Sequence, residues 1–281
     1  MSRSCIIFAC TILTEDRLFV LEEFLTNFKE KFSDSDIYIG INPGTIVAVE
    51  DVIKEYKLNT VTERASLDLY TVSDASAYQV ALKLLKDSKK SYDTYWFVHT
   101  KGGVNSHSDY LRKWYIDNLL EDRSYIEEFL VDNPKVGSYG LLGLEYDVNK
   151  IYSETDTEVS LFENKISGEL PYTHINFFYI HTLYVMRGEV LDKFFSLVTD
   201  KWFNSKLDRY YFEGVFPFIV SRSGYFPYIS NKRSMNGLDL SERHSSWILE
   251  NNLLTYTQYV DMHRTDYTFD QLNPPYVNSN A

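Results

Sequence analysis

Short apolar runs alternate with amphipathic segments through the first hundred residues, and this alternation limits the folds open to the chain. The runs 5–12, 36–41 and 93–98 have strand length and are mainly apolar, as expected for strands that helices cover on both faces. In 17–32 and 73–85, apolar residues recur at intervals of three and four, which indicates helices with one buried stripe. Strands that alternate with helices predict a mostly parallel sheet with right-handed crossovers.

The rest of the chain fits the same class of fold. Further helices are predicted over 46–58, 110–120, 125–131, 188–197 and 209–221, and further strands over 59–63, 136–144, 174–179, 182–186 and 224–229. The stretch 145–172 is polar and lacks periodicity, so we expect a mobile lid or an acceptor loop there. We therefore expect one α/β domain over residues 1–230, with residues 231–281 as a C-terminal extension packed on it.

Composition excludes several classes of partner. The 281 residues carry a formal net charge of -12, which repels a nucleic acid backbone but still allows a few placed groups to bind a small diphosphate. Cys5 and Cys10 lie at an odd spacing in one predicted strand, so they point to opposite faces and form no disulfide. This cysteine usage predicts a reduced, cytoplasmic protein. No apolar stretch approaches the ~18 residues of a membrane span, so no transmembrane segment is expected.

A polar turn follows the strand predicted at 93–98. It reads His99-Thr100-Lys101-Gly102-Gly103, and its two glycines let the backbone turn sharply or approach a ligand closely. In an open parallel sheet, ligands bind beyond the carboxyl ends of the strands, where the strand order reverses. The first and fourth predicted strands meet this description. Their ends supply Thr11 and the turn, and Asp74 begins the helix before the fourth strand, so we expect the chemistry here.

Over roughly residues 4–228, the order of elements resembles the GT-A fold of nucleotide-sugar glycosyltransferases. In that fold a helix like 76–82 leads to an apolar strand that ends in Asp-x-Asp, whose carboxylates hold a divalent metal against the donor diphosphate. Here the same place reads His99-Thr100-Lys101. The run 95–102 looks like the strand-end motif of a divergent branch that includes rhamnan-synthesis-like and some viral or bacterial surface-polysaccharide transferases. The resemblance implies a single GT-A-like, Rossmann-related domain.

Two later segments add to this resemblance. The segment 177–195 looks like the strand that borders the acceptor site, followed by a helix. Glu213 precedes Gly224 by eleven residues, with Arg222 between them, and this order is similar to the acidic residue, arginine and glycine of inverting members. The resemblance implies transfer of a hexosyl or pentosyl group from a nucleoside-diphosphate sugar to a glycan or other hydroxyl acceptor in polysaccharide biosynthesis, with Glu213 as the base.

The chemistry of such a transfer requires particular groups. Negative charge develops on the departing phosphate, so the site needs positive charge or hydrogen-bond donors there, and a base for the acceptor hydroxyl. Lys101 is the candidate catalytic cation beside Glu213, while Asp74 is a candidate ribose or base contact and Arg112 a bidentate phosphate contact. The residues expected to bind the nucleotide sugar are Thr11, Asp74, His99, Thr100, Lys101, Gly102, Gly103 and Arg112. No metal ligand is predicted, and a divalent Mn or Mg ion stays an open alternative to metal independence.

Other interpretations of the same residues remain open. Lys101 and Arg112 also fit solvated charges, His99 a structural histidine and Asp74 a helix cap. A hydrolase or nucleotidyltransferase would need a carboxylate-rich metal motif, and the Gly-x-Ser-x-Gly, Walker and Gly-x-Gly-x-x-Gly motifs are absent from the sequence. The main alternative is a non-catalytic carbohydrate-binding or scaffold module that keeps the fold.

Overall fold

A computed structural model provides the structure of the protein. It describes residues 3–66, 74–104, 106–141, 143–145, 177–179, 182–205, 207 and 211–229. The predicted extension at 231–281 and the predicted lid from residue 146 onward lie outside these ranges.

The described elements follow the order expected from the apolar pattern. The strands are β1 Ser4–Cys10, β2 Asp36–Ile41, β3 Thr60–Arg64, β4 Thr94–His99, β5 Val136–Gly140, β6 Gly143–Glu145, β7 Phe177–Tyr179, β8 Tyr184–Arg187 and β9 Phe226–Ile229. The α-helices are α1 Leu18–Lys31, α2 Ala48–Glu55, α3 Asp74–Ser88, α4 Asp109–Tyr115, α5 Arg123–Asp132, α7 Gly188–Leu197 and α8 Tyr211–Arg222. Shorter helical turns are η1 Glu15–Arg17, η3 Ser106–Ser108, η4 Ile116–Leu120 and η7 Asp200–Asn204.

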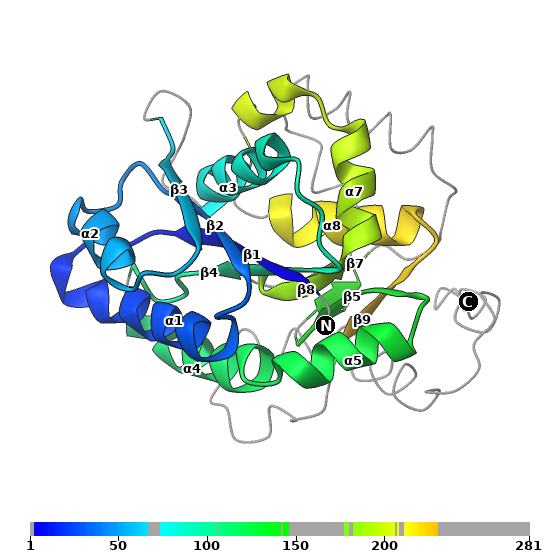
Figure 1. Cartoon of the computed structure of the whole chain (residues 1–281), viewed down its shortest axis with the longest axis horizontal. Helices are drawn as coiled ribbons and strands as arrows, with labels where there is room; N and C mark the ends of the chain where they lie inside the picture. Colours follow the sequence, from blue (N-terminus) through cyan, green and yellow to red (C-terminus); the bar gives the residue numbers. More distant parts are fainter. Residues whose placement is uncertain are drawn as a thin grey trace, which may run out of the picture.

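Seven strands form one sheet in the order β3-β2-β1-β4-β8-β5-β9. Neighbouring strands run parallel except where β8 lies antiparallel between β4 and β5. Strands β6 and β7 form a separate antiparallel pair. The fold class predicted from the sequence, an α/β domain with a mostly parallel central sheet flanked by helices, is confirmed (Figure 1).

Helices cover both faces of this sheet. In Figure 1, α1, α4 and α5 lie on one side and α3, α7 and α8 on the other. The side chains of β1 alternate between two apolar clusters, with Ile6 and Phe8 toward α1 and with Cys5 and Ile7 toward α3. Both faces of β1 are therefore buried, which is the reason for its continuous apolar sequence.

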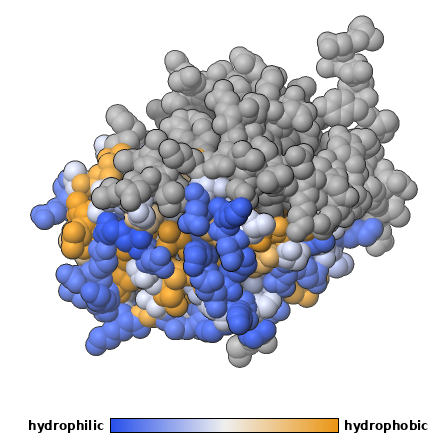
Figure 2. All heavy atoms as spheres, turned by 90° about the horizontal axis from the view of Figure 1, so that it is seen from above, coloured by the Kyte–Doolittle hydropathy of each residue, from blue (hydrophilic) through white to orange (hydrophobic). Residues whose placement is uncertain are grey.

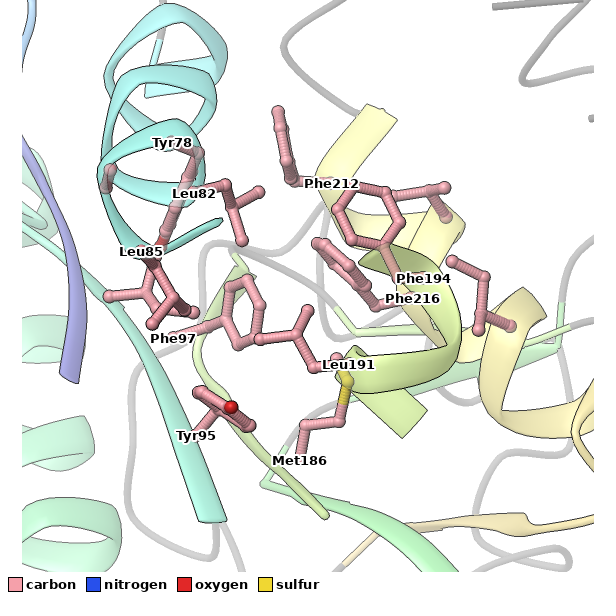
Figure 3. Packing of buried hydrophobic residues seen from close by; sticks show 14 of the residues in the cluster. Tyr78, Leu82, Leu85, Tyr95, Phe97, Met186, Leu191, Phe194, Phe212 and Phe216 are labelled. Carbon is pink, nitrogen blue, oxygen red and sulfur yellow. The ribbon is translucent and has the colours of Figure 1, made fainter. Parts of the chain in front are cut away.

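The core on the α3 face is strongly aromatic. Phe97 of β4 stacks on Tyr184 of β8 at 4.9 Å between ring centroids and also contacts Phe216 of α8 at 4.7 Å. Figure 3 shows Phe97 and Phe216 among the side chains that fill the space between α3, α7 and α8. Aromatic packing of this kind explains much of the high aromatic content, as the common structural role of such residues predicts.

Two predicted elements differ from the structure. The strand predicted over 136–144 is divided into β5 and β6, with Leu141 between them. The helix predicted over 110–120 changes from α4 into the π-helical turn η4, where the Glu121 amide donates to the Ile116 carbonyl five residues earlier at 3.0 Å. Periodicity cannot distinguish these cases because both apolar patterns continue across the break.

The surface of the described residues is mixed. Figure 2 shows hydrophilic side chains interspersed with smaller hydrophobic groups on the face it presents. Large exposed apolar side chains include Phe19, Val47 and Val104, each in the segment after a strand that ends at the carboxyl edge of the sheet. Among the helices that the structure describes, none has the length and apolar character needed to cross a membrane.

Candidate functional site

The carboxyl ends of β1 and β4 meet where the strand order reverses. The chain passes from β1 to β2 and β3 on one side, and it returns through α3 to β4 on the other side of β1. In this pairing Ala9 lies opposite His99. The predicted meeting of Thr11 with the His99-Thr100-Lys101-Gly102-Gly103 turn is thus present, at the type of place where open parallel sheets bind ligands.

Hydrogen bonds join the turn to the end of β1. The Thr100 hydroxyl accepts from the Thr11 amide at 2.7 Å and donates to the Thr11 carbonyl at 3.0 Å. The Gly103 amide donates to the Thr100 carbonyl at 2.9 Å. The Thr100 hydroxyl and the Gly103 amide are therefore used within the turn itself, and we assign both groups to its architecture instead of to ligand binding.

Both glycines of the turn are required by its geometry. Gly102 has a φ of +88°, in the left-handed region that favours glycine. A Cβ on Gly103 would lie 2.1 Å from the Thr11 carbonyl oxygen, so any side chain there would push the turn away from β1. The glycine pair noted in the sequence thus serves close backbone packing between two strand ends.

Two arginines lie against the same turn, Arg17 at the end of η1 and Arg112 on α4. Arg17 donates to the Gly102 carbonyl through Nε at 2.9 Å and through Nη2 at 2.6 Å, and it also pairs with Asp109. Arg112 pairs with Asp109 and, through Nε at 2.7 Å, with Glu23. Burial acts to raise the pKa of Asp109, but hydrogen bonds from Arg17 and Arg112 lower it from its ordinary value.

Arg112 therefore occupies a different place from the one expected. It is 1% exposed, and two of its guanidinium nitrogens already contact carboxylates. A phosphate would have to reach a side chain that is already buried and held by two carboxylates. We assign Arg112 to the ion pairs beside the turn instead of to direct phosphate binding.

Beside the turn, Asp74, His99 and Thr11 form a hydrogen-bonded cluster. One carboxylate oxygen of Asp74 lies 3.0 Å from His99 Nδ1, and the other accepts from the Thr11 hydroxyl at 2.9 Å. Burial acts to raise the pKa of Asp74, but the charge of His99, hydrogen bonds from His99 and Thr11 and the charge of Lys101 lower it from its ordinary value. Lys101 therefore lies close enough to this cluster to act on it electrostatically.

The helix that carries the predicted base begins near the same edge, because Phe212 packs on Tyr78 and Tyr78 lies beside His99. Glu213 lies in the first turn of this helix, directly after Phe212. The Phe212 ring packs 5.2 Å from that of Tyr78, and the Tyr184 hydroxyl donates to the Phe212 carbonyl at 3.1 Å. The start of α8 is thus held against α3 and β8. The side chain of Glu213 lies outside the described part of the chain, so its role stays a prediction.

The side chains at the end of β4 do not fit a divalent cation. Magnesium and manganese favour oxygen ligands, chiefly carboxylates. Here the strand ends in an imidazole and an ammonium, and both oxygens of Asp74 already have partners. Within the described residues, no group of three or more His, Cys, Asp or Glu side chains is placed to hold a metal ion. Cys5 and Cys10, predicted to form no disulfide, are buried free thiols.

Known protein sequences add little to this picture. No protein-family model matches the chain, and no curated protein matches it.

Similar solved structures are glycosyltransferases, at low similarity. Mannosyltransferase PcManGT from Pyrobaculum calidifontis, in complex with GDP-Man and Mn2+, has a TM-score of 0.44 and 10% identity over 97% of this chain and 67% of its own. Glucosyl-3-phosphoglycerate synthase from Mycobacterium tuberculosis, with Mn2+ and UDP-glucose, has a TM-score of 0.33 and 12% identity, and the match covers 68% of this chain and 57% of that one. Core-mannan synthase A from Aspergillus fumigatus, in its Mn/GDP form, has a TM-score of 0.31 and 9% identity, and the match covers 79% of this chain and 66% of that one. All three TM-scores lie below 0.5, so the site is interpreted from its own residues.

Sequence reasoning missed the ion pairs beside the turn. Arg17 and Glu23 belong to the segment recognised only as a helix, and Asp109 was not singled out. One local signal was available, because Asp109 and Arg112 are three residues apart on a predicted helix, a spacing that favours an ion pair. The contact between Arg17 and Gly102 spans 85 residues, and only the tertiary structure brings those groups together.

Proposed function

We propose that the protein is a glycosyltransferase that takes its sugar from a nucleoside-diphosphate sugar, with the diphosphate bound at the cationic turn after β4. The observation that carries the proposal is the position of Lys101 and His99 on a rigid turn, at the carboxyl edge between β1 and β4. Positive charge at this place stabilises the charge that develops on the leaving diphosphate.

The rigidity of the turn supports this role. A preorganised cation stabilises the transition state without having to move when charge develops. Thr100 fixes the turn to β1, and Arg17 fixes its Gly102 carbonyl. Lys101, between these two fixed points, keeps an intermediate exposure that leaves it accessible to a ligand.

The proposed reaction does not need a metal at the end of β4. Lys101 and His99 supply the charge that a carboxylate-bound ion supplies in enzymes with Asp-x-Asp. The similar structures that contain Mn2+ make metal dependence the natural competing hypothesis. A glycan or other hydroxyl acceptor, inversion of the anomeric centre and a cytoplasmic location belong to the proposal on the grounds given by the sequence.

Glu213 is the proposed base that removes the acceptor proton as the acceptor oxygen attacks the anomeric carbon. The bond from that carbon to the phosphate oxygen breaks, and the diphosphate leaves with the electron pair. Glu213→Gln is expected to keep nucleotide affinity and to lower transfer by ~10²-fold or more. Parallel titration and turnover measurements check this. Equal loss of affinity and turnover would mean that the residue has only a structural role.

A screen of nucleotides and nucleotide sugars tests the function itself. A ligand that binds only the native state raises the melting temperature by mass action. We expect at least one nucleoside diphosphate to do so in the presence of a chelator, and its sugar conjugate to be hydrolysed or transferred under the same conditions. If no nucleotide changes the melting temperature, the scaffold interpretation is favoured. Turnover that chelator abolishes and manganese restores would refute the metal-independent form of the proposal.

A further inference from the structure

One nitrogen of the site has no assigned partner. His99 is 6% exposed, and its Nδ1 lies 3.0 Å from Asp74. Its Nε2 is buried, and no hydrogen-bond partner for it occurs among the residues that the structure describes. Leaving a buried polar group without a partner is unfavourable, because the group has lost its hydrogen bonds to water. Such an atom marks a place where a ligand or a bound water completes the bonding.

The contact with Asp74 determines which imidazole nitrogen carries hydrogen. The pKa of Asp74 is lowered, as described above, so the group is an ionised carboxylate at neutral pH. A carboxylate only accepts hydrogen bonds, so Nδ1 must be the donor. Nε2 is then a bare acceptor in the neutral imidazole and an N–H donor in the imidazolium. Because phosphate oxygens are acceptors, only the imidazolium can bind one through Nε2.

The groups around His99 leave this role to Nε2. Tyr78 of α3 lies beside the imidazole at 6.5 Å between ring centroids, but its hydroxyl donates to the Thr182 carbonyl at 2.9 Å. Among the described groups, Asp74 on α3 and Lys101 on the turn act on this cluster. The same end of the sheet also carries Arg17, Arg112 and Asp109, which pair with one another at the turn, and Arg64 with Glu50, which pair beside β2. Cys10, at the end of β1, stays an uncharged thiol because burial raises its pKa. In the pair of Asp74 and His99, the carboxylate is therefore already bound to Nδ1, and the ammonium group of Lys101 lies close by.

Building on the function proposed above, we propose that Asp74 and His99 act as one unit that binds the donor diphosphate. Asp74 accepts the Nδ1 hydrogen, and His99 presents Nε2–H to a phosphate oxygen. Asp74 is then a positioning residue, in place of the ribose or base contact expected from the sequence. Nucleotide affinity is consequently linked to a proton, and it falls as rising pH removes the imidazolium.

Two substitutions at one position separate the roles of the two nitrogens. The amide nitrogen of asparagine can replace Nδ1 and keep the bond to Asp74, whereas that of glutamine can replace Nε2 as a neutral donor. The experiment titrates UDP and GDP, with chelator present, from about pH 5.5 to 8.5, a range that includes the ordinary titration of histidine near pH ~6.5. His99→Asn is expected to lose about tenfold in affinity at the acidic end, the scale of one charge-assisted hydrogen bond. His99→Gln is expected to lose less.

The pH dependence is the readout that a structural role would not change. The terminal phosphate of each nucleotide also titrates near pH ~6, so the His99→Asn curve provides the baseline for the ligand. Wild-type affinity should exceed this baseline at low pH and approach it at high pH, whereas His99→Gln should stay parallel to it. Asp74→Asn should lower nucleotide affinity at the acidic end, because the carboxylate that accepts the Nδ1 hydrogen and orients the ring is gone. Asp87→Asn, which removes an exposed ion pair with Lys83 on the same helix, is the matched control.

Nitrogen-15 NMR of the histidine side chains tests the unit without relying on affinity. The resonance missing from His99→Asn identifies His99, and the wild-type protein should show a protonated Nδ1 and an Nε2 signal that moves when UDP or GDP is added. The inference would be overturned if the wild-type protein bound these nucleotides with the same pH dependence as His99→Asn and its Nε2 signal did not move. The proposed function would still stand in that case. A wild-type protein that binds neither nucleotide at any pH would overturn both.

Discussion

The two ends of the central sheet both carry clusters of charged groups, but the clusters are organised differently. At the amino end, Lys90 pairs with Asp36 at 2.7 Å, and Arg123 pairs with Asp34 at 2.6 Å. At the carboxyl end, Arg17 and Arg112 hold a backbone turn, while His99 keeps a buried nitrogen without a described partner. The first cluster joins surface elements to one another, whereas the second supports a fixed loop.

One cleft among the described residues lies away from the candidate chemistry. A cleft of about 480 Å³ lies at the amino end, lined by Arg3, Ser4, Asp34, Asp36, Lys89, Lys90, Ser91 and Tyr92. Its charges largely neutralise one another, and the Tyr92 hydroxyl also donates to Asp36. We place the site at the carboxyl end, because there the positive groups are held on a turn at the point where strand order reverses.

The largest expected effect comes from removing a positive charge at the carboxyl end, and the same change at the amino end is its control. Lys101→Met should lower donor turnover by ~10²-fold or more, because it deletes the proposed preorganised charge at the leaving group. Lys90→Met makes the same change beside Asp36 at the amino end and should leave turnover within about twofold, since exposed ion pairs contribute little. Steady-state kinetics with the donor found by screening provides the measurement. Similar losses in the two variants would remove the distinction between the ends.

A pair of glycines gives a sharper test of intermediate size. A Cβ on Gly103 would lie 2.1 Å from the Thr11 carbonyl at the carboxyl end, and one on Gly188 would lie 2.0 Å from the Tyr92 carbonyl at the amino end. Both alanine variants should lose roughly 1–3 kcal/mol of stability through overpacking. Only Gly103→Ala should also weaken nucleotide binding. Thermal melts and nucleotide titrations distinguish the outcomes, and a binding defect in Gly188→Ala alone would contradict the assignment of the site.

The smallest expected effect is a loss of folding stability at acidic pH, and here the two ends of the sheet should behave alike. Burial acts to raise the pKa values of Asp109 and Asp36, but hydrogen bonds lower both from the ordinary value. The donors are Arg17 and Arg112 for Asp109, and Lys90 and Tyr92 for Asp36. A carboxylate whose pKa is lower in the native state stabilises the fold at pH values above its ordinary pKa. That stability is lost as the pH falls through the native pKa.

The wild-type melting temperature should therefore fall more steeply below about pH 4 than that of Asp109→Asn or Asp36→Asn. The difference should amount to roughly a few degrees, the change that accompanies about 1 kcal/mol in a domain of this size. Melting curves at stepped pH measure it. Identical slopes in all three proteins would show that neither carboxylate is coupled to folding.

Much of the architecture could be predicted because its signals are local. The apolar run 36–41 coincides with β2, and helix α7 was predicted at its observed bounds. The meeting of Thr11 with the turn followed from a general rule about where parallel strands end. The antiparallel direction of β8 was not predicted, because it depends on the edge at which the chain re-enters the sheet.

The candidate site was harder to predict than the fold. Sequence reasoning grouped Thr100, Gly103 and Arg112 with the ligand contacts, since their residue types suit that role. In the structure their polar groups bond to the protein itself. Which polar groups remain for a ligand depends on contacts between segments about 90 residues apart, such as Arg112 with Glu23, and no local pattern contains that information.

The aromatic core described above also bears on how the protein is made. Phe97 lies in the first hundred residues, but the rings that pack on it belong to Tyr184 and Phe216, which are synthesised much later. Figure 3 shows Phe97 beside Phe216. When residue 140 is added to the growing chain, β8, α7 and α8 have not yet been made, so the face of β4 that they cover is protected only by α3. Contacts of such long sequence separation form late and slowly, and exposed apolar strands invite association between nascent chains. We therefore expect association between nascent chains to be most frequent after β4 is synthesised and before α8 emerges.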